Sequence, residues 1–219
     1  MKKLSEQAWN RKNDGLRRTA VFLGASAVIL TFSLCAPPNA ERFDMIGMEL
    51  AVVALAIFLW KFPIGIYFSA NLFTLSAAAG SILKLYDRFP GYDRVVHFIS
   101  GLLLGYIGVY LINRIFARLH TESIPVLVVL FAGMFAFFGA GFWEIVEFLT
   151  DCVVHMDVQH GNTDTMGDIV AGYLGGILYQ GCLLFQYRKY FSKANIMKFI
   201  KGEPVPANAA ALQKEHAAR

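Results

Sequence analysis

The sequence predicts an all-α polytopic integral membrane protein, a bundle of six transmembrane helices with the N and C termini in the cytoplasm. Two observations lead to this fold class. Of the 219 residues, 56% are hydrophobic and 16% are charged, with a mean hydropathy of +0.49, whereas a soluble domain carries about 25% charged residues. The apolar residues also gather in runs long enough to cross a membrane as helices. The predicted spans are 19–37, 45–60, 64–85, 93–112, 124–150 and 164–185.

Polar segments flank this membrane domain, which is expected to cover residues 19–187. Residues 1–18 are basic, and the apolar run that follows is longer than that of a signal peptide, so it is expected to remain as a span. Residues 188–219 begin with a basic amphipathic segment that suits a short helix on an anionic membrane surface. The Ala-rich tail from residue 203 is expected to be unstructured.

Proline and polar residues mark the first three spans. Pro37 and Pro38 end the first span, and residues 61–63 leave only a tight turn between the second and the third. The third span contains several Ser and Thr residues together with Asn71, so we expect it to face other helices rather than lipid. Asn71 could line a cavity, or it could make an interhelical hydrogen bond of about 1 kcal/mol or less.

The charges predict the orientation of the six spans. One side of the membrane holds both termini, the 61–63 turn and the 113–123 loop, and with them 16 of the 20 Lys and Arg residues. The positive-inside rule makes this side cytoplasmic. Because this sidedness explains the basic pI near 9.0, no nucleic-acid partner is expected. The Lys and Arg residues on the outer side are Arg42, Lys84, Arg88 and Arg94.

Acidic residues stand at both edges of the polar break between the fifth and sixth spans, on the predicted outer side. Glu144, Glu147 and Asp151 are spaced by three and four residues, so they share one face of a helix. Asp164 and Asp168 share a face of the next helix in the same way. Carboxylates in or near hydrocarbon are costly and usually functional. The sequence therefore predicts a site at this edge of the membrane.

The fourth span brings similar residues to the same side. Asp93 and His97 repeat the four-residue spacing at its start. Glycines then continue the face of His97, and glycines likewise continue the face of Asp168 on the sixth span. Two GxxxG pairs allow close helix approach, either within one chain or between two chains of a homo-oligomer. These pairs are Gly101 with Gly105 and Gly172 with Gly176.

Several carboxylates close together need a compensating charge, because like charges in a low dielectric oppose one another's ionisation. A divalent cation is the simplest compensating charge. A ligand set of one imidazole and several carboxylates suits Zn, Mn, Mg or Ca. The sequence has no HExxH and no CxxC that would narrow this choice. The predicted metal ligands are His97, Glu144, Glu147 and Asp168, and the predicted catalytic or supporting carboxylates are Asp93, Asp151 and Asp164.

Each member of the cluster also has a simpler interpretation. Asp93 and Asp164 stand near helix starts, where a capping carboxylate needs no further role. Asp151 could be solvated beyond the end of the fifth span, and His155 and His160 are expected to be exposed loop residues. The four predicted ligands could instead form a hydrogen-bonded network that only ties the helices together.

Three motifs in this order resemble the YjdF-type bacterial inner-membrane proteins, which are similar to the VanZ-like proteins of glycopeptide resistance. The motifs are DRVVH at 93–97, EIVE at 144–147 and DTMGDIVAGYLGG at 164–176. In place of the Gln and Asn of the VanZ-like pattern, this chain has Glu147 and Gly172. The resemblance implies a protein of the bacterial cytoplasmic membrane that is linked to the cell envelope, but it implies no reaction.

Two functions follow as hypotheses. The first is a metal-dependent membrane enzyme that hydrolyses a lipid head group, or transfers a group from it, at the outer leaflet. The second is a non-enzymatic protein that binds or carries a lipid, an ion or another small molecule and is related to envelope stress or glycopeptide resistance. A transport site is expected near the bilayer midplane, where only Asn71 offers a polar group. Membrane lipids are the expected partners in both cases.

Overall fold

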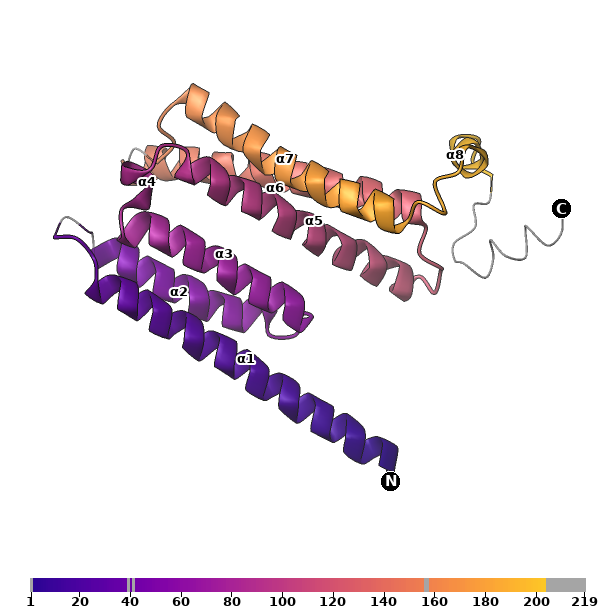
Figure 1. Cartoon of the computed structure of the whole chain (residues 1–219), viewed down its shortest axis with the longest axis horizontal. Helices are drawn as coiled ribbons and strands as arrows, with labels where there is room; N and C mark the ends of the chain where they lie inside the picture. Colours follow the sequence, from indigo (N-terminus) through magenta and orange to yellow (C-terminus); the bar gives the residue numbers. More distant parts are fainter. Residues whose placement is uncertain (1, 39, 41, 156–157, 204–219) are drawn as a thin grey trace. The chain divides into compact units, whose positions relative to one another are not determined.

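The computed structural model describes residues 2–38, 40, 42–155 and 158–203, and within these residues all regular structure is helical (Figure 1). The all-α prediction is therefore confirmed. Most of the predicted unstructured tail lies outside the described residues. The helices are α1 (Lys2–Leu34), α2 (Arg42–Leu59), α3 (Ile64–Ile82), α4 (Leu85–Arg88), α5 (Tyr92–Arg118), α6 (Pro125–Val154), α7 (Asn162–Gln186) and α8 (Lys193–Ile200).

Four of the described helices are long and apolar enough to cross a membrane. They are α5, α6, α7 and the part of α1 from Asn13 to Leu34. The remaining two predicted spans correspond to α2 and α3, which are only 18 and 19 residues long. Charged residues interrupt α2, and Ser, Thr and Asn residues lower the hydropathy of α3. The membrane character is thus supported, while the six-span count and the orientation stay predictions.

The helix ends differ from the predicted spans in two ways. The basic N-terminal segment and the first span form one continuous helix, α1. Around the predicted polar break, α6 continues four residues beyond the predicted end of the fifth span. Helix α7 begins two residues before the predicted sixth span, at Asn162. The connection after α6 is therefore short. His155, His160 and Gly161 in this connection have positive φ angles, which turn the chain sharply.

The chain divides into two compact units, residues 1–96 and 97–219, with the division inside α5. In the first unit, α1, α2 and α3 pack around small and branched apolar side chains. Lys84 forms an ion pair with Asp44 at 3.4 Å, which joins the end of α3 to the start of α2. The buried core residues of this unit are Ala25, Ile29, Val52, Ala78 and Ile82.

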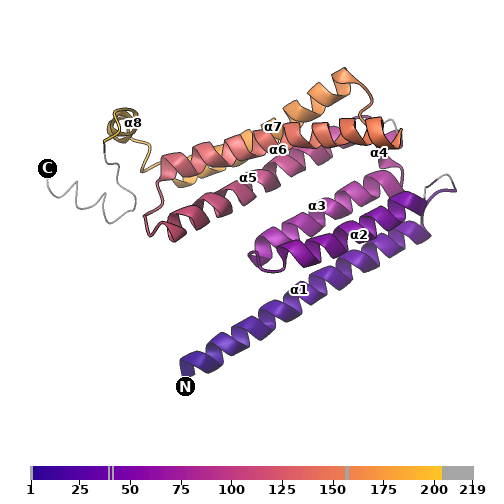
Figure 2. The same cartoon turned by 180° about the vertical axis from the view of Figure 1, so that it is seen from behind.

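In the second unit, α6 and α7 run antiparallel and side by side (Figures 1 and 2). Helix α5 approaches α7 so closely that a β-carbon on Gly101 would overlap the carbonyl oxygen of Gly172. A β-carbon on Gly175 would likewise overlap the carbonyl oxygen of Phe98. The close approach expected of the GxxxG residues is thus confirmed, and in this structure it occurs within one chain.

Candidate metal centre

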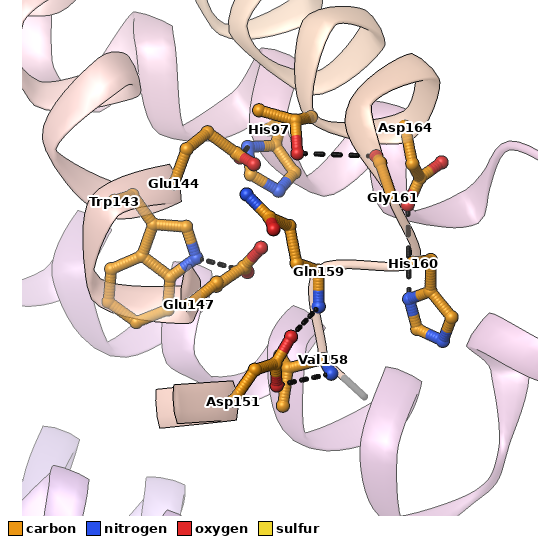
Figure 3. A network of polar contacts seen from close by, with 11 residues as sticks. His97, Trp143, Glu144, Glu147, Asp151, Val158, Gln159, His160, Gly161 and Asp164 are labelled. Atoms are coloured by element: carbon orange, nitrogen blue, oxygen red, sulfur yellow. Dashed lines mark hydrogen bonds and ion pairs between the residues drawn. The ribbon is translucent and has the colours of Figure 1, made fainter. Parts of the chain in front are cut away.

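The centre of the site is the pair formed by His97 of α5 and Glu144 of α6. His97 Nδ1 lies 3.7 Å from Glu144 Oε1, and the two side chains are only 6% and 4% exposed. This separation is longer than a hydrogen bond. Glu147 follows one turn later on α6 and is half-buried. One potential ligand atom from each of these three residues lies within 4.8 Å of the other two (Figure 3).

Asp168 of α7 contributes a further carboxylate beside His97. Its side chain is 2% exposed, and one of its carboxylate oxygens lies within 4.8 Å of a ring nitrogen of His97. The small residues explain how two helices can come so close beside these carboxylates. A β-carbon on Gly172, one turn after Asp168, would lie 2.9 Å from the β-carbon of Ala140, one turn before Glu144.

Trp143 fixes the position of the more accessible carboxylate. Its indole Nε1 donates a hydrogen bond of 2.7 Å to Glu147 Oε1 from one turn away on the same helix. Figure 3 shows this hydrogen bond between the Trp143 indole and the carboxylate of Glu147. Trp143 was not predicted as part of the site. The four-residue spacing of Trp143 and Glu147 was the available signal for their contact.

Asp151 holds the loop between α6 and α7 in place. Its two carboxylate oxygens accept hydrogen bonds from the backbone N–H groups of Val158, at 2.7 Å, and Gln159, at 2.9 Å. Figure 3 shows that the Gln159 side chain then points toward His97 and Glu147. Nothing in the spacing of the sequence indicates this position of Gln159, because it depends on the path of the loop.

Asp164 lies beside a histidine of the connecting loop. His160 Nδ1 lies 3.9 Å from Asp164 Oδ2, and this pair is considerably more exposed than His97 and Glu144. Both His155 and His160 are exposed, as predicted. Asp164 lies in the first turn of α7, and Thr165 Oγ1 donates to the carbonyl oxygen of Gly161 at 3.3 Å.

The structure thus sorts the predicted site residues into an inner and an outer group. The four predicted metal ligands meet at His97: its ring lies within 4.8 Å of carboxylate oxygens of Glu144 and Glu147 on α6 and, in a separate set, of Asp168 on α7. In the outer group, Asp151 anchors the loop, and Asp164 lies beside His160. Asp93 lies one turn before His97 on α5 and is half-buried. The inner group consists of His97, Glu144, Glu147 and Asp168.

These features define a class: an all-helical membrane protein with several apolar helices and a buried cluster of one histidine and several carboxylates. Residues 18–189 match the family described as "Predicted membrane protein (DUF2238)", and the chain belongs to this family.

One relative is an uncharacterized protein from Thermotoga maritima, which is 28% identical over 108 residues. This match covers 49% of the present chain and 54% of the relative, so the chain spans about half the length of that protein. No solved structure matches the chain.

Proposed function

We propose that the inner group binds a divalent cation, and that the protein is a membrane-embedded enzyme acting on a lipid head group by hydrolysis or group transfer. The observation that carries this proposal is the grouping of His97, Glu144 and Glu147 within 4.8 Å, with the first two buried. Asp168 extends the same ligand set from α7. Imidazole and carboxylate together are ligands for Zn, Mn, Mg or Ca.

The described residues suggest a role for each side chain in such a reaction. A bound divalent cation would polarise a phosphoryl or acyl oxygen of the substrate. Glu147 is the most accessible of the four ligands, and Trp143 orients its carboxylate. Asp151 accepts hydrogen bonds from two backbone N–H groups, and Asp93, Asp151 or Asp164 would serve as the general base or support the cation.

The surroundings of the cluster support a lipid substrate. Phe142 and Trp143 precede Glu144 on α6, Phe148 follows Glu147, and all three aromatic side chains are exposed. Such a surface suits contact with lipid near the head groups. We further propose that six helices span the bacterial cytoplasmic membrane, with both termini cytoplasmic and the cluster facing the periplasm at the outer leaflet.

The test is the metal content of the detergent-purified protein, measured by mass spectrometry for the unsubstituted chain, Glu144→Gln and Asp168→Asn. Asp87→Asn serves as the control, because Asp87 is an exposed carboxylate outside the cluster. We expect a stoichiometric metal in the unsubstituted chain and the control, and its loss in the two cluster variants. Release of glycerol phosphate from phosphatidylglycerol, or of inorganic phosphate from a polyprenyl phosphate, would then be assayed. Folded protein that takes up no metal would refute the proposal.

A second candidate function is a non-enzymatic lipid- or ion-binding protein, or a carrier, as the VanZ-like resemblance suggests. Glu144 and Asp168 are almost completely buried. This burial favours a site that encloses an ion over a site that is open to a lipid head group. Accumulation of a labelled ion in proteoliposomes, lost on substitution of Glu144, would support the carrier. Metal binding without lipid turnover or accumulation would support a structural or binding role.

A further inference from the structure

A second buried polar cluster lies in the first unit, between α1 and α3. Arg18 of α1 is 9% exposed, while Tyr67 and Asn71 of α3 are 0% and 2% exposed. The guanidinium carbon of Arg18 lies 6.0 Å from the centre of the Tyr67 ring. Tyr67 and Asn71 are four residues apart, so they share one face of α3. None of these residues belongs to the proposed metal site.

Three polar atoms of this cluster are buried and make no hydrogen bond of good geometry among the described residues, although the Asn71 side chain lies near the Tyr67 hydroxyl: Arg18 Nη1, the Tyr67 hydroxyl oxygen and Asn71 Oδ1. Asn71 Nδ2 donates to the carbonyl oxygen of Tyr67 at 2.8 Å, which fixes the orientation of the amide and leaves its oxygen as the acceptor. The cluster therefore offers a guanidinium donor, a hydroxyl donor and an amide acceptor.

The charge of Arg18 calls for an anion. A guanidinium stays protonated in proteins, and burying it is costly unless it is paired. No described carboxylate forms an ion pair with Arg18, whereas the neighbouring Arg17 has one at 4.0 Å with the exposed Asp14. Guanidinium groups bind phosphate strongly, since their parallel N–H groups match its oxygens.

An open groove lined by sequence neighbours of Arg18 and Tyr67 indicates where the rest of such a ligand would lie. It has a volume of about 420 Å³ and lies between α1 and α3. Except for Arg17, its side chains are apolar, and Arg17 stands directly beside Arg18 in the sequence. The groove is lined by Arg17, Ala20, Val21, Ile64, Gly65 and Phe68.

We propose that Arg18, Tyr67 and Asn71 bind the head group of an anionic phospholipid, with an acyl chain in the adjoining groove. The phosphate accepts hydrogen bonds from Arg18 and Tyr67. Asn71 Oδ1 accepts one from a head-group donor, such as a glycerol hydroxyl. Arg18 would attract either a lipid phosphate or a free anion, but only a lipid has an acyl chain that fills the apolar groove. Phosphatidylglycerol satisfies all three groups.

The test is native mass spectrometry of the full chain in detergent, titrated with dioleoylphosphatidylglycerol. Dioleoylglycerol lacks the phosphate, dioleoylphosphatidylcholine lacks the head-group donor, and inorganic phosphate lacks the acyl chains. We expect phosphatidylglycerol to bind more tightly than any of these three. Arg18→Gln and Tyr67→Phe should each weaken its binding by about tenfold, since each removes a hydrogen bond to a charged group.

Arg42→Gln is the matched control, because Arg42 is an exposed arginine at the start of α2, in the same unit. Its affinity for phosphatidylglycerol should equal that of the unsubstituted chain. Tyr67→Phe retains the aromatic ring, so it keeps the proposal testable where Arg18→Gln fails to fold. Unchanged affinity in folded Tyr67→Phe and Arg18→Gln would overturn the site. Equal binding of dioleoylglycerol would overturn phosphate recognition, and equal binding of inorganic phosphate would overturn the lipid as its source.

Discussion

His97 Nδ1 and Glu144 Oε1 lie 3.7 Å apart in the interior of the second unit, on different helices. Burying two ionisable side chains is costly unless each is paired or hydrogen-bonded in a well-defined geometry. The arrangement here depends on small residues, because Gly101, Gly172 and Ala140 let the backbones come close just beside the pair. The site and the packing are therefore linked, and each can be perturbed separately.

Metal binding should stabilise the folded chain. A cation at about 100 times its Kd contributes about 2.7 kcal/mol, which corresponds to a rise in Tm of about 5–10 °C for a chain of this length. We expect this rise for the unsubstituted chain in a thermal-shift measurement with Zn²⁺ or Mn²⁺, and for the Asp87→Asn control. Glu144→Gln should abolish it. An equal rise in Glu144→Gln would place the bound ion elsewhere.

Gly101→Ala should destabilise the second unit. The added β-carbon would overlap the carbonyl oxygen of Gly172, and overpacking of this kind costs about 1–3 kcal/mol. Gly141→Ala is the control, since a β-carbon on this helical glycine meets no atom within 4 Å. It should be neutral or slightly stabilising. Unfolding in denaturing detergent measures both variants, and equal stabilities would contradict the close approach of α5 and α7.

Trp143→Phe should weaken metal binding without removing it. The variant loses the hydrogen bond to Glu147 but keeps an aromatic side chain on α6. Loss of a residue that orients a ligand typically reduces metal affinity by about 10- to 100-fold. The exposed neighbour Phe142 supplies the control, as Phe142→Leu should leave the affinity unchanged. If both variants bind as the unsubstituted chain does, Glu147 is either not a ligand or does not depend on Trp143.

Regular spacing explains why the sequence predicted the inner group. Glu144 and Glu147 share a helix face by their separation alone, and the glycine stripes after His97 and Asp168 mark the faces that meet. Arg18 was not predicted as a buried residue, because its contacts lie on another helix and because it ends the basic N-terminal segment of the sequence. Gln159 was missed for a related reason: its position depends on a loop, which has no periodicity.

Asp151→Asn tests whether this carboxylate anchors the loop or supports the cation directly. The sequence predicted it to be catalytic or supporting. In the structure it accepts hydrogen bonds from the N–H groups of Val158 and Gln159. Its replacement by a neutral amide should weaken both bonds, so hydrogen exchange at these two amides should become about tenfold faster or more. Asp164→Asn is the matched control, because Asp164 is also acidic and near the loop but accepts neither bond.

Metal affinity and turnover then distinguish the two roles of Asp151. A carboxylate that only anchors the loop should leave metal affinity nearly unchanged when it is replaced, while turnover falls because Gln159 is no longer held toward His97. A carboxylate that supports the cation directly should lose metal affinity to the same extent as Glu144→Gln. Faster exchange with unchanged metal affinity would establish Asp151 as a positioning residue. Unchanged exchange would show that the loop is held by other contacts.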